Sequence, residues 1–318
     1  MVITIIMVAY NARSTIERAL YSISHQSFSD FEVLIIDDGS TDGSEDVYSR
    51  WTYKDNRIKV YQQNHLGVSA ARQKGIDLAQ GEFIIHVDAD DWVDSDFLSK
   101  LITQAKQTDA DLTSCNYWEE SEERKTIREQ NPGEDADSTE MLRLLLNGYI
   151  GGSCCNKLIR ASVCKTVQFF PSSIQFREDE LFIAHILDRG IRISHVDEPL
   201  YHYWKATPGS LSKLPIARTY NDIKYLIVEF ESLVKKYRFT EDTLFIRKRE
   251  ILSNAFVLRE FQDLKTLFPE TRQQIITTKT PYNWRRPRSF FLRWALMGYP
   301  HLASFLYRIN AKIVTTFS

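Results

Sequence analysis

Four short apolar runs in the first third of the chain constrain its fold more than any other feature of the sequence. They span residues 2–8, 32–36, 57–61 and 82–87, and three of them show little or no polar alternation. Strands that are apolar on both faces belong inside a parallel sheet whose two sides are covered by helices. We therefore expect four buried strands.

Helical patterns lie between these runs. One carries an apolar stripe of Ile16, Leu20 and Ile23, and another extends from 68 to 79. The alternation of strand and helix predicts an α/β fold, a Rossmann-like and mostly parallel sheet flanked by helices. Ligands of such sheets bind outside the carboxyl ends of the strands.

The length of 318 residues predicts about two domains, at roughly 150 residues each. From about Thr219 onward the apolar periodicity is helical, so we expect an α/β domain over 1–217 and a helical C-terminal region over 218–318. Residues 119–137 are highly charged and predict an exposed connection.

Charge and cysteine content exclude several classes of protein. The net charge is −2, which gives the whole chain no general attraction for nucleic acid. None of the four cysteines forms a CxxC pair, which favours buried thiols in a reducing compartment. The N-terminus is interpreted as a strand rather than a signal peptide, and no run of 18 apolar residues predicts a membrane span.

The stretch "VDADD" at 87–91 places carboxylates directly after the fourth apolar run. Asp88 and Asp90 are separated by one residue, and such a pair can bind a divalent cation, Mn²⁺ or Mg²⁺, while leaving room for phosphate ligands. The alternative is that these aspartates only cap the helix that follows.

Three other positions are candidates for binding. Asp38 ends the second run in "IIDDGSTD", where it can accept hydrogen bonds or can simply form a turn. Tyr10 in "VAYN" can stack on a base or pack internally. Arg72 in "GVSAARQKG" can approach an anion or form an ordinary salt bridge. The GxGxxG fingerprint is absent, which argues against a nicotinamide cofactor.

A second acidic cluster, "FREDELF" at 176–182, holds Glu178 and Asp179 at the predicted start of a helix. Carboxylates are common there because they interact favourably with the helix dipole. They are also suited to general base catalysis.

The end of the chain is basic and rich in large apolar residues. After Glu270 there is no acidic residue, whereas eight lysines and arginines follow. Residues 282–313 therefore predict amphipathic helices on an anionic membrane surface. The alternatives are a helix packed on the catalytic domain or on another subunit, and a nucleic-acid arm, which the density of apolar residues disfavours.

In their order and spacing, these motifs resemble the inverting family 2 glycosyltransferases with the GT-A fold. The matching stretches are "ITIIMVAYNARSTIERALYSISHQSFSDFEVLIIDDGSTDGS", "GVSAARQKGIDLAQGEFIIHVDADDW" and "CNKL…FREDELF…VDEPLYHYW". The resemblance covers roughly residues 1 to 210. It departs at "MVAYN", where the family often has Pro-x-Tyr-Asn, and at Trp204, near a position where relatives often carry Arg.

The resemblance implies a catalytic domain with a nucleotide-sugar half at 1–117 and an acceptor half at 118–217. It implies a site for a nucleotide sugar, most often a UDP-sugar, with Asp179 as catalytic base and Glu178 beside it. Asp90 and Asp88 would bind Mn²⁺ or Mg²⁺. The implied donor-binding residues are Ala9, Tyr10, Asp38, Arg72, Asp88 and Lys205, with Ser210 a second substitute for the missing Arg.

We therefore expect an enzyme that moves a sugar to a glycan, lipid-linked or polymeric acceptor in cell-surface polysaccharide synthesis. We expect it in the cytoplasm, peripheral on the inner face of the cell membrane, with no nucleic-acid partner. Two alternatives remain open: a catalytically inactive sugar-nucleotide-binding or scaffold protein, and a nucleotidyltransferase. A nucleotidyltransferase is expected to carry a Gly-rich loop after the first strand, and "VAYNARST" contains no glycine.

Overall fold

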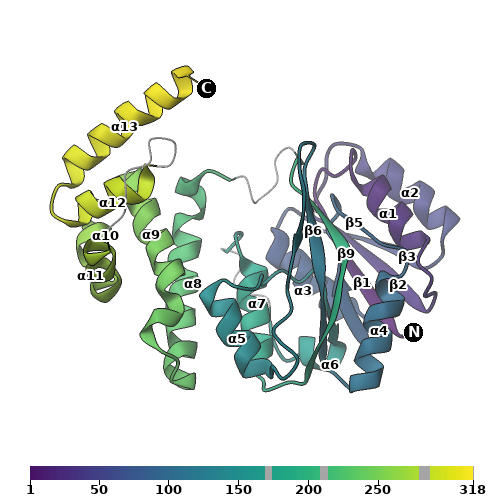
Figure 1. The fold of residues 1–318 in the computed structure, drawn as a ribbon. Helices are drawn as coiled ribbons and strands as arrows, with labels where there is room; N and C mark the ends of the chain where they lie inside the picture. Colours follow the sequence, from purple (N-terminus) through teal and green to yellow (C-terminus); the bar gives the residue numbers. More distant parts are fainter. Residues whose placement is uncertain (169–173, 208–213, 279–286, 318) are drawn as a thin grey trace. The chain divides into compact units, whose positions relative to one another are not determined.

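The structure is a computed structural model, and it describes residues 1–168, 174–207, 214–278 and 287–317 (Figure 1). The chain divides into two compact units. The first contains 1–145 and 149–213, and the second contains 146–148 and 214–318. The boundary predicted at 217 falls in the first turn of α8 (Ile216–Tyr237).

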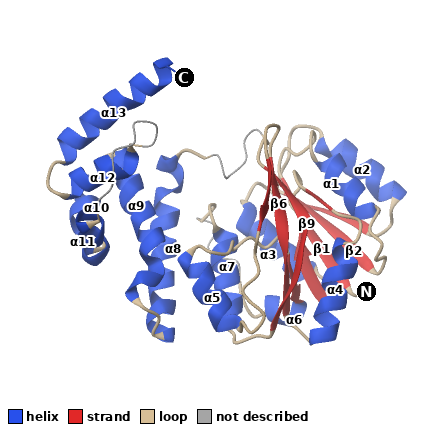
Figure 2. Cartoon of the chain, viewed as in Figure 1, coloured by secondary structure: helices blue, strands red, loops and turns tan. Residues whose placement is uncertain are grey.

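The first unit is a sheet with helices on both faces (Figure 2). Its strands are β1 (Ile3–Ala9), β2 (Phe31–Asp37), β3 (Ile58–Gln62), β4 (Phe83–His86), β5 (Trp92–Val93), β6 (Leu112–Glu120), β7 (Lys125–Arg128), β8 (Lys157–Arg160) and β9 (Ile193–Trp204). Its helices are α1 (Ile16–Ser24), α2 (Ser44–Lys54), α3 (Val68–Leu78), α4 (Phe97–Thr108), α5 (Ser138–Asn147), α6 (Ala161–Cys164) and α7 (Glu178–Leu187).

The strands form one sheet in the order β3-β2-β1-β4-β8-β6-β9-β5, with β7 paired to β6. The four predicted strands are β1 to β4, and they pair in parallel as expected. Beyond β4 the sheet is mixed, because β8 runs antiparallel to both β4 and β6. The predicted α/β fold is confirmed. The parallel strand pairs lie mainly among β1 to β4.

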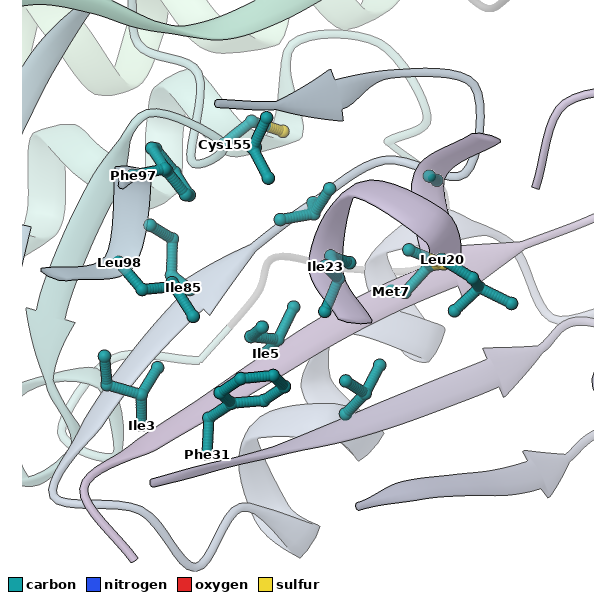
Figure 3. Close-up of a cluster of buried hydrophobic side chains, with 14 of the residues drawn as sticks. Ile3, Ile5, Met7, Leu20, Ile23, Phe31, Ile85, Phe97, Leu98 and Cys155 are labelled. Atoms are coloured by element: carbon teal, nitrogen blue, oxygen red, sulfur yellow. The ribbon is translucent and has the colours of Figure 1, made fainter. Parts of the chain in front are cut away.

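One face of the sheet packs against α1 and α4 to form the core (Figure 3). Alternate residues of β1 point into this core and are at most 1% exposed. Figure 3 shows the cluster, which includes Ile3, Ile5, Met7, Leu20, Ile23, Phe31, Ile85, Phe97 and Leu98. Burying each such side chain stabilises the fold by about 1.5–3 kcal/mol.

The opposite face of β1 packs closely against α3. A Cβ added at Gly75 of α3 would lie 2.4 Å from Cγ2 of Ile6, so glycine is required for this approach of helix to sheet. The tight packing fixes where α3 begins, and with it the position of Arg72 one turn later.

One segment differs from the sequence-based expectation. The charged stretch 119–137 is only partly an exposed connection, because β6 extends to Glu120 and pairs with β7 as a hairpin. Ion pairs such as Arg128 to Glu119, at 2.9 Å, stabilise this polar hairpin. All four cysteines are buried and free, as predicted.

The second unit is helical. It contains α8, a short 3₁₀ helix (Glu241–Leu244), α9 (Phe245–Leu258), α10 (Phe261–Thr266), α11 (Pro269–Thr277), α12 (Arg288–Leu296) and α13 (Pro300–Phe317). Among the described residues, we find no helix whose length and hydropathy would let it cross a bilayer. Residues 282–286 of the predicted membrane-binding tail lie outside the described residues.

Candidate active site

A cavity of about 670 Å³ opens in the first unit, where β1, β2 and β4 end. Most of the predicted site residues line it together: Tyr10, Asp38, Arg72, Asp88, Asp90, Glu178 and Asp179. Ala9 and Lys205 do not line this cavity as the described residues form it. Carboxyl ends of parallel strands are the expected place for a ligand site.

Asp38 organises one side of the cavity. Its carboxylate accepts hydrogen bonds from the backbone N–H groups of Leu66 and Gly67, at 2.8 and 2.9 Å, and from the Gln63 amide at 2.8 Å. His65 Nδ1 lies 3.0 Å from the same carboxylate. Asp38 thus fixes the loop between β3 and α3, and its backbone N–H donates to the carbonyl of Ala9 at 2.9 Å.

Tyr10 presents an aromatic face on this side. It is 49% exposed and stacks on the imidazole of His65, with ring centroids 4.2 Å apart. No motif in the sequence points to His65, which lies in a polar loop. An exposed, stacked pair of flat rings beside a cavity is suited to binding a planar group.

Arg72 joins the two acidic clusters. Its Nη2 donates to Oδ1 of Asp88 at 3.3 Å, and its Nε lies 3.8 Å from Oε1 of Glu178. Burial by itself would lower the pKa of Arg72, but the charges of Asp88 and Glu178 outweigh burial and raise the pKa well above its usual range. The guanidinium therefore stays charged and holds both carboxylates near one another.

The four carboxylates after β4 have different environments. Asp91 is buried, and it accepts hydrogen bonds from the Tyr201 hydroxyl at 2.5 Å and the Trp204 N–H at 2.7 Å. Asp94 lies 3.0 Å from Nε2 of His202. Asp88, Asp90 and Asp91 all line the cavity, but the bonds of Asp91 and Asp94 to β9 indicate that these two residues stabilise the fold. The helix that follows has no side-chain cap, so capping does not explain the cluster.

Asp88 and Asp90 suit a divalent cation. Burial, and then the nearby charge of Asp88, raise the pKa of Asp90 above its usual value, so Thr207 and the charge of Arg18 compensate its anionic form only in part. Within the described residues, no group of three or more His, Cys, Asp or Glu side chains could hold a metal ion by itself. Two carboxylates still fit Mn²⁺ or Mg²⁺, because these ions take their remaining ligands from water and phosphate.

Glu178 and Asp179 are the first two residues of α7, and Glu178 lies near Arg72. Burial, followed by the charge of Asp179, raises the pKa of Glu178 to about 8. Burial also raises the pKa of Asp179, whose Oδ1 accepts a hydrogen bond from the Glu180 N–H at 2.8 Å. A carboxylate with a raised pKa, held in a cavity, is suited to accept a proton.

The loop before β8 supports this acidic pair. In the sequence, only the "CNKL" stretch at the end of this loop belongs to the resemblance. Lys157 is buried and its Nζ donates to the carbonyls of Gly151 and Ser153, at 3.0 and 2.8 Å. A Cβ added at Gly152 would lie 2.5 Å from Cα of Glu180, so this glycine lets the loop pack against α7. Cys155 donates from Sγ to Asp88 at 3.1 Å.

Lys205 follows β9 and is half-exposed. Its Nζ lies 3.3 Å from Oε1 of Glu119, and its N–H donates to the carbonyl of Glu120 at 2.8 Å. Thr207 is the residue of this segment that lines the cavity, and it lies close enough to Asp90 to lower the pKa of that carboxyl. Ser210 lies outside the described residues.

Comparison with known proteins gives consistent matches. The model of the family "Glycosyl transferase family 2" matches residues 4–168. The putative glycosyltransferase EpsH of Bacillus subtilis is 32% identical over 209 residues, which are 63% of this chain and 60% of that protein. This chain therefore spans about three fifths of the length of that relative.

Solved structures share the fold. TarS 1-349 of S. aureus, in complex with UDP-GlcNAc, matches with a TM-score of 0.64 and 21% identity, covering 98% of this chain and 92% of that chain. The mannosyltransferase PcManGT of Pyrobaculum calidifontis, in complex with GDP-Man and Mn²⁺, matches with a TM-score of 0.53 and 16% identity, covering 96% and 86%. The predicted GT-A fold is thereby confirmed, and the chain belongs to glycosyl transferase family 2.

Proposed function

We propose that this protein is an inverting, metal-dependent glycosyltransferase that uses a UDP-sugar. One observation carries the proposal: a single cavity contains the pair Asp88 and Asp90, the acidic pair at the start of α7, and the exposed ring of Tyr10. These are the groups that a reaction of this class needs for the departing diphosphate, the attacking hydroxyl and the base of the nucleotide.

The nucleotide would lie against Tyr10 and the loop that Asp38 fixes. A uracil ring is planar and can stack on an exposed aromatic face. The complexes of TarS with UDP and with UDP-GlcNAc support the choice of UDP. Asp38 would contribute through the loop whose backbone it holds, and Arg72 through the position that it gives Asp88.

Asp88 and Asp90 would hold Mn²⁺ or Mg²⁺. A divalent cation supplies Lewis-acid stabilisation of the negative charge that develops on a leaving diphosphate. The Mn²⁺ named with PcManGT supports a metal in this fold, and the burial of Asp90 beside Asp88 supports its place in this chain.

Asp179 would accept the proton of the acceptor hydroxyl. The hydroxyl oxygen attacks the anomeric carbon from the side opposite the diphosphate, the bond from that carbon to the phosphate oxygen breaks, and the proton moves to Asp179. Such proton transfer typically contributes about 10² to 10⁴-fold to the rate. Glu178, whose pKa is raised to about 8, would stay largely protonated near neutral pH and could donate a hydrogen bond.

The acceptor would be a glycan, lipid-linked or polymeric molecule of the cell surface, reached from the cytoplasmic face of the membrane. Buried free cysteines support a reducing compartment. Leu302, Phe305 and Ile309 lie on one face of α13 and are 50%, 60% and 41% exposed. This apolar face would enter an anionic membrane surface.

Fewer arginines than the sequence suggests are available for that contact. Arg272 and Arg293 donate to the backbone carbonyls of Lys265 and Ile276, and Arg288 donates to Asn254. Arg308 of α13 remains exposed. The apolar face therefore supports the membrane contact better than the net basic charge does.

The test is a screen of UDP-sugars for manganese-dependent release of UDP, with pyrophosphate measured in the same samples. Release of UDP is expected, whereas pyrophosphate would indicate a nucleotidyltransferase. Asp179→Asn should lower turnover by about 10² to 10⁴-fold and leave UDP affinity within about twofold. A variant as active as the parent would exclude Asp179 as the base, and the absence of any product would favour an inactive binding protein.

A further inference from the structure

The cavity contains an aromatic surface that the donor does not require. Tyr117 of β6 and Tyr203 of β9 both line it, as does Phe176 just before α7. The strands β6 and β9 are paired, with Glu119 opposite Tyr203, so Tyr117 and Tyr203 are diagonal neighbours on the same face. Their rings meet edge to face, with centroids 6.5 Å apart.

The order of the strands separates this pair from the nucleotide side. Tyr10 follows β1, Asp88 and Asp90 follow β4, and Tyr117 and Tyr203 lie on β6 and β9, in the sheet order β1-β4-β8-β6-β9. Strands lie about 4.8 Å apart, so β1 and β6 are separated by roughly 14 Å. The aspartate pair therefore lies between two aromatic surfaces.

Tyr117 lies close to the proposed base. A Cβ added at Gly151 would lie 3.8 Å from the hydroxyl of Tyr117, and one added at Gly152 would lie 2.5 Å from Cα of Glu180, so one loop borders both Tyr117 and the start of α7. Burial is the main cause that raises the pKa of Tyr117; the charges of Glu119 and Asp179 raise it further, and that of Arg128 opposes them. A molecule seated on the tyrosine pair would thus have its hydroxyls near Asp179.

The chemistry of the surface indicates its ligand. The C–H groups on one face of a pyranose ring carry partial positive charge and pack well on the negative face of an aromatic ring. The carboxylate of Asp179 near Tyr117 disfavours a phosphate or another anion at this position, whereas the charge of Glu119 is balanced by Arg128 and Lys205.

We propose that Tyr117 and Tyr203 form the acceptor subsite, and that it binds a neutral pyranose ring whose free hydroxyl faces Asp179. The inference rests on the proposed function, since it assumes that a donor sugar is transferred in this cavity. It narrows the acceptor to a molecule that ends in a cyclic sugar, and it makes an acyclic polyol phosphate a poor acceptor.

The test measures binding to the full chain saturated with UDP and Mg²⁺. Saturation-transfer NMR titrations would use the methyl pyranosides of glucose, galactose and N-acetylglucosamine, with ribitol as an acyclic polyol. At least one pyranoside should bind and ribitol should not. Tyr203→Ala should weaken that binding about tenfold, whereas Tyr203→Phe, which keeps the ring, should change it less than about twofold.

Tyr53→Ala is the matched control, because Tyr53 is 93% exposed on α2 and does not line the cavity described above. The dissociation constant of UDP, measured in the same samples, should be unchanged in all three variants. Equal binding of ribitol, or an unchanged pyranoside affinity in Tyr203→Ala, would overturn the acceptor subsite alone. Failure of the parent to bind UDP would instead contradict the proposed function on which it rests.

Discussion

The guanidinium of Arg72 donates to Asp88 at 3.3 Å from within α3, and this contact ties the helix to the carboxylates that follow β4. The same side chain lies 3.8 Å from Glu178 at the start of α7. One buried cation thus lies between two acidic clusters that are 90 residues apart in the sequence. Because Arg72 contacts a residue of each cluster, its placement is essential to the shape of the cavity.

Removing that cation should destabilise the fold. Arg72→Met leaves the Asp88 carboxylate without its buried cationic partner, and breaking a buried pair in this way costs about 3–5 kcal/mol. Arg50→Met is the matched control, since Arg50 pairs with Glu17 at 2.8 Å and both side chains are more than half exposed. The control should lose at most about 1 kcal/mol. Urea unfolding measures the free energy of unfolding of both variants. If the two variants lose equal stability, the role of Arg72 is contradicted.

The raised pKa of Glu178 predicts how stability changes with pH. An exposed glutamate titrates near about 4.3, whereas burial raises the pKa of Glu178 in the folded protein to about 8. Between these values the folded protein holds a proton that the unfolded chain has released, so this residue makes stability fall as pH rises. Glu178→Gln should remove that fall.

The measurement is the free energy of unfolding of parent and Glu178→Gln at about pH 5, 7 and 9. The variant should gain stability relative to the parent as pH increases across this range. Parallel profiles would show that Glu178 titrates normally and is not desolvated.

Tyr10 should contribute to nucleotide affinity through its exposed face. Tyr10→Ala is expected to weaken UDP binding about tenfold in calorimetry, because a stacking surface is lost. Tyr21→Ala is a close control: Tyr21 is 60% exposed and its ring lies against that of His25, with centroids 4.1 Å apart and a tilt of 30°. Tyr21 lies on α1 and does not line the cavity described above. If both variants bind UDP as the parent does, the base does not lie on Tyr10.

Much of the first unit could be predicted because its signals are local. The runs that became β1 to β4 are apolar on both faces, and such runs have few alternatives to a parallel sheet. The aspartates after β4 could be identified as a candidate site by their crowding alone. Which aspartate has which role could not be predicted. Asp91 is distinguished from Asp90 by its bonds to Tyr201 and Trp204, which lie more than 100 residues away in the sequence.

The residues that were missed share this dependence on distant pairing. Tyr117 and Tyr203 come together only because β6 and β9 pair in parallel. No motif in the sequence of either strand indicates that the two strands are neighbours. The β6–β7 hairpin was missed because its polar side chains mask the strand pattern. Lys205 was selected by analogy, but in the structure its ammonium group lies against Glu119.

The exposed face of α13 should mediate attachment to membranes. Replacing Leu302 and Phe305 with serine is expected to reduce cosedimentation with phosphatidylglycerol vesicles by about tenfold or more, since each apolar side chain contributes about 1.5–3 kcal/mol when buried. Val228→Ser, at a position of α8 that is 64% exposed, is the control. Equal sedimentation of parent and double variant would exclude this face as the contact.

The central claim is that Asp88 and Asp90 bind a divalent cation together with the diphosphate of a UDP-sugar. Calorimetric titration of UDP into the parent and into Asp90→Asn, each with Mn²⁺ and with EDTA, tests it most directly. The parent should bind UDP much more tightly with Mn²⁺ than with EDTA, and the variant should lose most of that difference. Equal affinities of the parent in the two buffers, together with an unaffected variant, would contradict the account.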